Sequence, residues 1–181
     1  DAPCPVIVDP AMADNGALYA GFDTGFPTQM AGLCAYADVI LPNLSEASLM
    51  TGIPYIGEDA SEEYIKTLLD ALAGLGARYA VITGVTHSDN TFGFYGIDTA
   101  TAEYFKYGAP KVPYRSHGTG DIFASAFTGA LLNKHTVYEA LKKAADYEAH
   151  MGDLVELHLY RPKDGRKIVT GVLRSEERRV G

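Results

Sequence analysis

Short apolar runs alternate along the chain with longer segments in which apolar residues recur at helical spacing. A strand buried on both faces needs a continuous apolar run, whereas a helix packed on a sheet needs only one apolar side. The alternation of such strands with helices is typical of an α/β fold, in which helices flank a mainly parallel central sheet. The apolar runs predict five strands: Val6–Val8, Val39–Leu41, Tyr79–Thr83, Phe92–Ile97 and Thr101–Tyr107.

Helical spacing predicts five helices, of which Glu62–Leu75 has the clearest boundary signals. Asp59 or Ser61 can cap its start, and Gly76 can end it. The segment Asp121–Asn133 is nearly uncharged, so we expect this helix to be buried between other layers. The other helices are expected over Thr28–Ala37, Glu46–Thr51 and Thr136 to about Ala149, and the alternating segment Leu154–Tyr160 predicts one late strand.

Composition and charge narrow the classes of function without selecting one. At 181 residues, one globular domain of ordinary composition is the default. The formal charge of -8 argues against a nucleic-acid or anionic-membrane partner, because both need a positive surface, but it allows an anionic small molecule. Cys4 and Cys34 lack metal-ligand spacing, and so few cysteines favour a reduced, cytoplasmic setting. No apolar stretch is long enough to span a bilayer.

Both ends of the chain look unlike those of a complete protein. The sequence opens on Asp1 without an initiator Met, and residues 174–181 form a charge run unlike what precedes them. We therefore expect a fragment of a longer protein. Residues 1–149 are expected to form its catalytic part, and residues 150–181 a divergent or non-native tail.

The segment Gly118-Thr119-Gly120-Asp121 stands at the start of the nearly uncharged helix. Two glycines separated by one residue let the backbone turn sharply and approach a ligand without a Cβ in the way. The unpaired N–H groups of the helix start would complete an anion hole for a transferring phosphoryl group. Asp121 at its mouth would accept the proton of an attacking hydroxyl. A plain tight turn with a capping Asp fits these four residues equally well.

A second group of polar residues follows the strand Val39–Leu41. Asn43 and Glu46 would lie at the carboxyl edge of the sheet, where open α/β folds bind ligands. A carboxylate and an amide there suit Mg²⁺, which keeps several waters and takes few protein ligands. A helix cap, with Asn43 as the cap residue and Glu46 completing a capping box, explains the same pair and is favoured when the two are taken alone.

Polar residues also follow the first and third strands. Asp9 comes directly after the first, and Thr83 with Gly84 comes after the apolar run of the third. Asp9, Asn43, Thr83 and Asp121 would then meet at one edge of the sheet. Four independent caps would not converge in this way, so the sequence predicts a phosphoryl-transfer site at that edge.

The order of these motifs resembles the pyridoxal kinase branch of the ribokinase-like kinases. The resemblance extends over about residues 6–149 and implies an incomplete three-layer ribokinase-like fold. The phrases at 8–16 and 41–47 look most like bacterial pyridoxamine/pyridoxal kinases. The matching motifs are Asp-Pro-x-Met-x-Asp (9–14), Asn-x-x-Glu (43–46), Val-x-Thr-Gly (81–84) and Gly-Thr-Gly-Asp (118–121).

The resemblance implies a reaction and a role for the last motif. ATP would phosphorylate the 5′-hydroxymethyl group of pyridoxamine, pyridoxal or pyridoxine, a step of vitamin B6 salvage. Asp121 matches the catalytic base that activates this hydroxyl. Gly118, Thr119 and Gly120 match the anion hole.

The remaining motifs match the metal and nucleotide sites of the family. Glu46, with Asn43, would order the water shell of Mg²⁺, and Asp9 would lie near the metal and the phosphates. A monovalent cation such as K⁺ is a further candidate cofactor, and the family implies a homodimer for the full-length protein. The expected nucleotide-binding residues are Asn43, Thr83, Gly84, Asp14 and Tyr19.

Two departures from the family leave alternatives open. Ala13 stands where many relatives have Gly, and the N-terminal portion that carries most vitamin-contacting residues is not in the sequence. A hydroxymethylpyrimidine kinase is the rival with the same chemistry, although many such enzymes have Cys where this chain has Asp121. The rival of another class is a nucleotide-binding but catalytically inactive fragment.

Overall fold

The computed structural model describes residues 4–110, 119–150, 155–158 and 170–173 of the chain. Its centre is one mixed sheet with the strand order β1-β4-β5-β6-β7. The first three strands run parallel, and β6 and β7 are each antiparallel to the strand before them. The strands are β1 (Ile7–Val8), β4 (Val39–Ile40), β5 (Tyr79–Thr86), β6 (Thr91–Asp98) and β7 (Glu103–Pro110).

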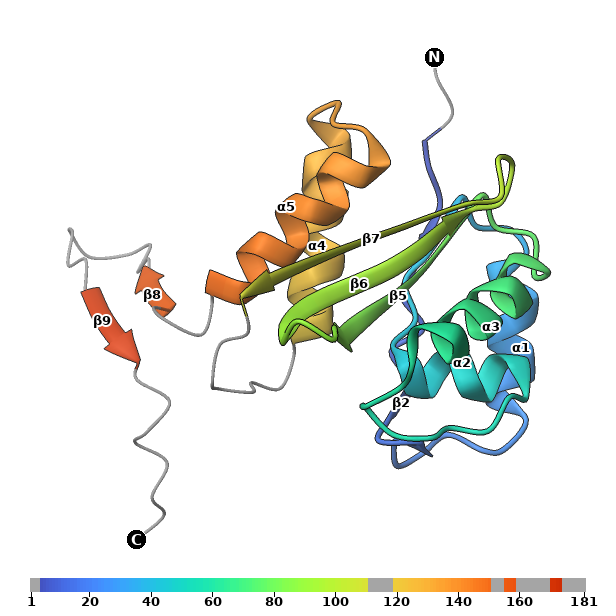
Figure 1. Ribbon diagram of the computed structural model, residues 1–181. Helices are drawn as coiled ribbons and strands as arrows, with labels where there is room; N and C mark the ends of the chain where they lie inside the picture. Colours follow the sequence, from blue (N-terminus) through green and yellow to red (C-terminus); the bar gives the residue numbers. More distant parts are fainter. Residues whose placement is uncertain (1–3, 111–118, 151–154, 159–169, 174–181) are drawn as a thin grey trace, which may run out of the picture.

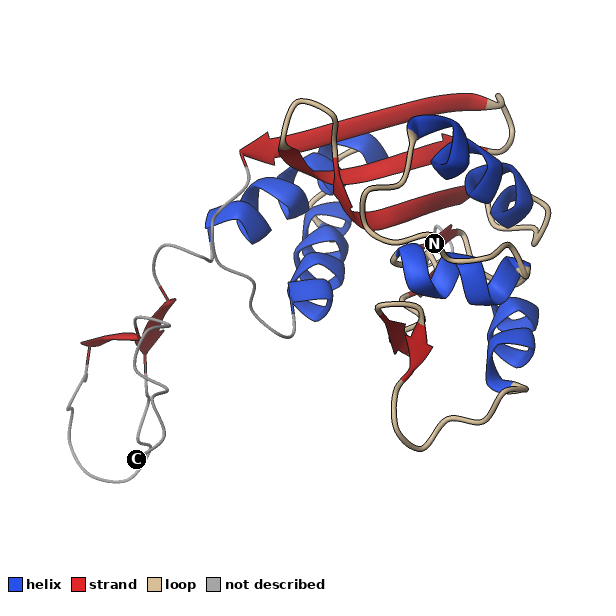
Figure 2. Cartoon of the chain, turned by 60° about the horizontal axis from the view of Figure 1, so that its bottom comes forward, coloured by secondary structure: helices blue, strands red, loops and turns tan. Residues whose placement is uncertain are grey.

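Helices cover both faces of this sheet, so the architecture has three layers (Figure 1). Three helices lie on one face and two on the other, as the turned view also shows (Figure 2). The first face carries α1 (Phe26–Cys34), α2 (Leu44–Thr51) and α3 (Glu62–Ala73), and the second carries α4 (Thr119–Leu132) and α5 (Val137–His150). The α/β fold expected from the sequence is confirmed.

The observed helix starts follow the predicted caps. The hydroxyl of Ser61 accepts a backbone hydrogen bond of 3.2 Å in the first turn of α3, so Ser61 rather than Asp59 is the cap. At α5, the N–H of Thr136 donates to the Glu139 carboxylate at 2.9 Å, as the capping box requires. The late strand is also present and pairs in a separate antiparallel sheet of β8 (Val155–His158) and β9 (Thr170–Leu173).

One expectation was wrong and one element was missed. The apolar helix α4 is not buried between layers: among its side chains only Phe123 and Phe127 are buried, and Leu132 is 70% exposed. It packs on α5 and the sheet along one side only. A short hairpin of β2 (Ala13–Asp14) and β3 (Ala17–Leu18) was not predicted. Among the described residues, no helix combines the length and apolar character needed to cross a membrane.

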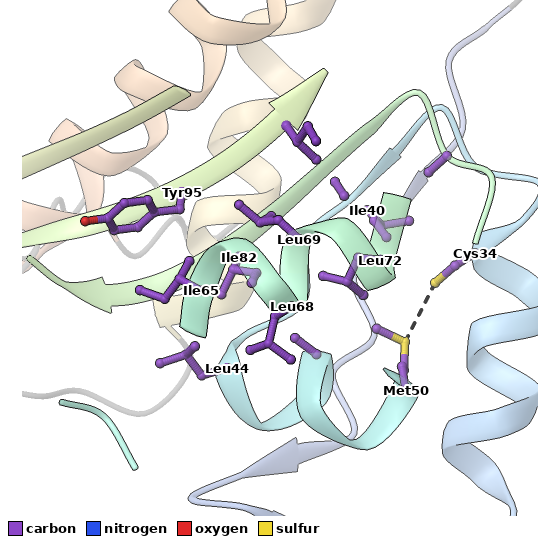
Figure 3. Close-up of a cluster of buried hydrophobic side chains, with 14 of the residues drawn as sticks. Cys34, Ile40, Leu44, Met50, Ile65, Leu68, Leu69, Leu72, Ile82 and Tyr95 are labelled. Carbon is purple, nitrogen blue, oxygen red and sulfur yellow. Dashed lines mark hydrogen bonds between the residues drawn. The ribbon is translucent and has the colours of Figure 1, made fainter. Parts of the chain in front are cut away.

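The core under α1–α3 is built on the apolar side of α3 (Figure 3). Its four inward residues recur at helical spacing and are at most 1% exposed: Ile65, Leu68, Leu69 and Leu72. They pack with Ile40 and Ile82 of the sheet. Near α1, the thiol of Cys34 lies 3.9 Å from the sulfur of Met50, and burial raises the pKa of this thiol to about 11.

The core on the other face is centred on an aromatic residue of the sheet. Phe94 of β6 is fully buried, and its ring lies 6.2–6.4 Å from four other aromatic rings, measured between centroids. One of these rings belongs to Phe123 of α4, two residues after Asp121. Aromatic packing therefore fixes the start of α4 against the sheet.

Candidate active site

The carboxyl ends of the parallel strands bring three of the predicted residues to one edge of the sheet. Asp9 directly follows β1, and Asn43 follows β4 as the residue before α2. Asn43 forms a parallel bridge with Thr83 of β5, and the N–H of Thr83 donates to the carbonyl of Pro42 at 2.9 Å. The predicted meeting of these segments at the sheet edge is present in the structure.

The predicted strand ended at Thr83, whereas β5 continues to Thr86, so Thr83 lies inside the strand and not at its end. The register between β5 and β6 shifts between Ile82 and Val85, so the ladder is irregular at Thr83 and Gly84. Gly84 has a φ of 71°, which residues with a Cβ disfavour. Irregularities of this kind redirect side chains near functional sites. We infer that the irregularity sets the position of Thr83.

Replacing Gly84 with Ala should destabilise this edge. Alanine resists the left-handed conformation, so Gly84→Ala should lower the free energy of unfolding by about 1–2 kcal/mol. No clash adds to this cost, since the new Cβ would lie 3.8 Å from the Phe92 ring. The matched control is Gly32→Ala in the exposed part of α1, where a Cβ meets nothing within 4 Å. The control should stabilise the protein by about 0.5–1 kcal/mol in urea unfolding; equal effects would contradict the strain argument.

Asn43 and Glu46 form the capping box that the sequence allowed as an alternative to a metal site. The N–H of Glu46 donates to Asn43 Oδ1 at 2.9 Å, and the N–H of Asn43 donates to Glu46 Oε2 at 2.8 Å. Glu46 Oε1 accepts from the N–H groups of Met12 at 2.9 Å and Ala13 at 3.4 Å. The box thus also ties the loop after Asp9 to α2.

Glu46 is buried, with only 2% of the residue exposed. Burial raises its pKa to about 6, the backbone hydrogen bonds lower it, and the charge of Asp9 adds to the rise. Because this pKa lies above the ordinary value of 4.5, the stabilisation from the protonated form is complete below about pH 4.5. It is lost as the pH rises through about 6.

The variant Glu46→Gln should therefore show a flatter pH dependence of stability than the wild type. The shift from 4.5 to about 6 corresponds to about 2 kcal/mol. The free energy of unfolding of the wild type should fall by about this amount relative to the variant as the pH rises through that window. Urea unfolding at several pH values measures the difference. Parallel pH profiles for the two proteins would contradict the assignment.

Asp121 lies in the first turn of α4, and its charge reaches the residues at the sheet edge. Burial raises the pKa of Asp9, and the negative charge of Asp121 raises it further. Burial also raises the pKa of Tyr19, and the charges of Asp14, Glu46, Asp121 and Asp9 add to this effect. Carboxylates from four separate segments therefore share one electrostatic neighbourhood.

This concentration of negative charge suits a bound cation. Among the residues that the structure describes, no Lys or Arg contributes to the pKa shifts of Asp9, Tyr19 and Glu46. Within the described ranges, no group of three or more His, Cys, Asp or Glu side chains could hold a metal ion. The arrangement fits Mg²⁺, which takes few protein ligands and keeps its waters, better than a metal that needs a closed protein cage.

The glycine motif is only partly within the described residues. Gly118 lies outside them, while Thr119 and Gly120 begin α4. A Cβ at Gly120 would meet none of the described atoms within 4 Å, so packing within that part of the chain does not require a glycine there.

A hollow of about 520 Å³ opens beside Asp121. Its described walls are Ile122, Ser125 and Ala126 of α4, and Tyr147 of α5. An apolar hollow with one carboxylate at its rim suits a small ligand that carries a ring. Another hollow of about 480 Å³ lies between the starts of β7 and α5, and none of the predicted site residues lines it.

The sequence analysis did not predict the residues that line the hollow beside Asp121. Ile122, Ser125 and Ala126 share one side of α4 with Asp121, so their spacing was a usable signal. Tyr147 lies far along the chain from Asp121, and only the packing of α5 on α4 brings it to the hollow. No local pattern predicts that contact.

Comparison with known proteins identifies relatives of this chain. The family model described as phosphomethylpyrimidine kinase matches residues 1–153. The pyridoxine kinase of Bacillus subtilis is 33% identical over 154 residues, which cover 78% of this chain and 51% of the relative. A hydroxymethylpyrimidine/phosphomethylpyrimidine kinase of Staphylococcus aureus is 30% identical, with 79% and 51% covered. The chain thus spans about half the length of the curated relatives that it matches.

Solved structures that superpose on this chain are also kinases of this kind. Pyridoxal kinase from Lactobacillus plantarum superposes with a TM-score of 0.69 at 36% identity, covering 78% of this chain and 50% of that one. An ADP complex of Bacillus subtilis pyridoxal kinase superposes with a TM-score of 0.63 at 27% identity, covering 78% and 52%. The fold is therefore the ribokinase-like fold of these enzymes, represented by about half of its length. This chain belongs to the phosphomethylpyrimidine kinase family.

Proposed function

We propose that the protein to which this chain belongs transfers the γ-phosphate of ATP to the 5′-hydroxymethyl group of a vitamin B6 compound: pyridoxamine, pyridoxal or pyridoxine. The observation that carries the proposal is the gathering of Asp9, Asn43 and Thr83 at the carboxyl edge of the sheet, near enough to Asp121 at the start of α4 for its charge to raise the pKa of Asp9. It joins a candidate base to a candidate cation site. The kinases among the relatives support the same chemistry, and three of those described above are named as pyridoxine or pyridoxal kinases.

In the proposed reaction, Asp121 accepts the proton of the attacking hydroxyl. A weak base is adequate, because phosphoryl transfer passes through a loose transition state that depends mainly on positioning and charge stabilisation. The exposed carboxylate at the rim of the hollow is accessible to a substrate. Thr119 and Gly120, with Gly118, would supply backbone N–H groups to the transferring phosphoryl group.

The nucleotide and its metal would bind along the sheet edge. Asp9 would lie near Mg²⁺, and Glu46, whose oxygens already accept backbone hydrogen bonds, would act through the water shell and by holding the loop after Asp9. Mg²⁺ would neutralise charge on the phosphates. The ADP complex of the Bacillus subtilis relative supports nucleotide binding by the protein to which this chain belongs. The proposed nucleotide contacts are Asn43, Thr83, Gly84, Asp14 and Tyr19.

A hydroxymethylpyrimidine kinase is the second candidate, favoured by the family description and by the Staphylococcus aureus relative. A panel of pyridoxamine, pyridoxal, pyridoxine and hydroxymethylpyrimidine with MgATP, read by coupled detection of ADP, separates the two. Fastest turnover of a vitamin B6 compound supports the proposal. Turnover of hydroxymethylpyrimidine alone overturns it.

The third candidate is a chain that binds nucleotide without turnover, favoured by its match to only half the length of its relatives. Titration calorimetry of the 181-residue chain with MgATP, beside the substrate panel, tests it. Heat of binding without ADP release supports this candidate. We propose a homodimer for the full-length protein on family resemblance alone, and sedimentation analysis measures it.

A further inference from the structure

β1 lies at one edge of the central sheet, although its composition suits an interior strand. The sheet order places β1 outermost, with β4 as its neighbour. Its two residues, Ile7 and Val8, are apolar and only half-buried, and Val6 before them is 48% exposed. Interior strands of parallel sheets are apolar on both faces, whereas exposed edge strands are usually protected by charged side chains or bulges. The composition of β1 therefore indicates a strand with a neighbour on each side.

The backbone of β1 leaves hydrogen-bonding groups at the open edge. The carbonyl of Val8 accepts from the N–H of Leu41 at 2.9 Å, so the polar groups of Val8 point toward β4. Because these groups alternate from side to side along a strand, the N–H and carbonyl of Ile7 point away from β4. No described strand lies on that side. Pro5 and Pro10 have no N–H, so further pairing would be confined to the residues between them.

One side of α4, on the same face of the sheet as Ile7, is also uncovered. Ile7 packs against the core that contains Phe123 and Phe127 of α4. The residues of α4 that point away from these two rings recur at helical spacing. None of them is charged, Ser125 is exposed, and Leu132 is 70% exposed. We call them the outer side of α4: Ile122, Ser125, Ala126, Gly129 and Leu132.

The neighbouring helix α5 has the polar surface expected of a helix that faces solvent. Glu139, Lys142 and Lys143 are exposed on it. In contrast, α4 has no Asp, Glu, Lys or Arg after Asp121. A helix without charge on any side is normally buried all round. The sequence of α4 thus indicates a cover that the described part of the chain does not supply.

The relatives have enough additional length for such a cover, because this chain spans only about half of them. We propose that the segment that precedes residue 1 in the complete protein adds a strand parallel to β1 and packs apolar side chains on the outer side of α4. The added strand is parallel because β1, β4 and β5 already run in one direction, and consecutive α/β units of a sheet keep that direction.

The cover also affects the hollow beside Asp121. Three residues of the outer side of α4 line this hollow: Ile122, Ser125 and Ala126. The added segment would therefore form a further wall of the hollow, next to the candidate base. The proposal does not depend on the substrate of the kinase.

Hydrogen exchange in the complete protein, followed by NMR, tests the added strand. The amide of Ile7 should exchange at least about 100-fold more slowly than in an unstructured peptide, because it donates to that strand. The amide of Val8 faces β4 and should be protected with or without a further strand, so it is the internal control. Exchange of the Ile7 amide near the unstructured rate overturns the proposal. Protection of Ile7 that is lost on dilution indicates a second copy at this edge and also overturns it.

Leu132→Ala in the complete protein tests the cover on α4. Alanine is the better helix former, so at a solvent-exposed position the change should leave the melting temperature within about 2 °C of the wild type. Beneath a cover, loss of the side chain should lower it by about 5 °C or more. The matched control is Ile56→Ala, at a loop position that is 58% exposed. Equal shifts in the two variants overturn the proposal. Neither measurement uses turnover, so failure here leaves the proposed reaction untouched.

Discussion

Asp121→Asn should reduce phosphate transfer by about 10²–10⁴-fold, the usual contribution of general acid–base catalysis. The amide keeps the shape of the side chain but cannot accept the proton of the attacking hydroxyl. Asp121 is exposed in the first turn of α4, so the substitution should leave folding intact. Affinity for MgATP should persist, because the proposed nucleotide contacts lie mainly on other segments.

The matched control is Asp59→Asn, the same change at an exposed loop position that none of the proposed contacts involves. Coupled detection of ADP gives the rate, and calorimetry with MgATP gives the affinity. Retention of most activity by Asp121→Asn would exclude this residue as the base. Loss of both activity and nucleotide affinity would instead point to a structural role.

Phe94→Ala should lower the free energy of unfolding by about 3–5 kcal/mol, the range for emptying a buried Phe site. The ring is fully buried and lies between the sheet and the helices of one face, near the rings of Phe105, Tyr107, Phe123 and Tyr138. Its removal leaves a cavity that these rings cannot all close, since they are attached to three different elements, β7, α4 and α5.

Tyr36→Ala is the control, because this aromatic side chain is 81% exposed. The control should change stability by less than about 0.5 kcal/mol. Urea unfolding followed by circular dichroism measures both variants. A change below about 1 kcal/mol for Phe94→Ala would show that the aromatic cluster repacks and does not fix α4 on the sheet.

The order of strands and helices could be predicted because in most segments the spacing of the apolar residues matches the side that the folded element buries. The apolar side of α3 is an example, as the four residues that recur at helical spacing are the four that the core buries. The prediction was wrong for α4, whose lack of charge suggested burial on all sides. The absence of charged residues on a helix does not determine which of its sides pack against other elements. The burial of such a helix depends on its tertiary contacts.

The β2–β3 hairpin shows a different limit. Each strand has two residues, too few for an alternating pattern, although the Asn15-Gly16 turn between them is a known hairpin signal. Both residues have positive φ, at 50° and 76°, as a two-residue turn of this kind requires. The turn was readable from the sequence, but the strands beside it were not.

The candidate site could be located from the sequence because the carboxyl ends of parallel strands share an edge. Two details could not be foreseen. The irregularity at Gly84 depends on how β5 pairs with β6, and no local pattern encodes that register shift. The place of Tyr147 beside Asp121 depends on the packing of α5 on α4.

The buried pair of Cys34 and Met50 has a practical consequence for labelling. Alkylating reagents attack the thiolate, and Cys34 is 0% exposed with a pKa raised to about 11, whereas Cys4 is exposed. Modification of Cys34 therefore requires α1 to separate from α2, while Cys4 is accessible in the folded state. The rate at which Cys34 becomes modified after Cys4 therefore measures the separation of α1 from α2, and no engineered cysteine is needed.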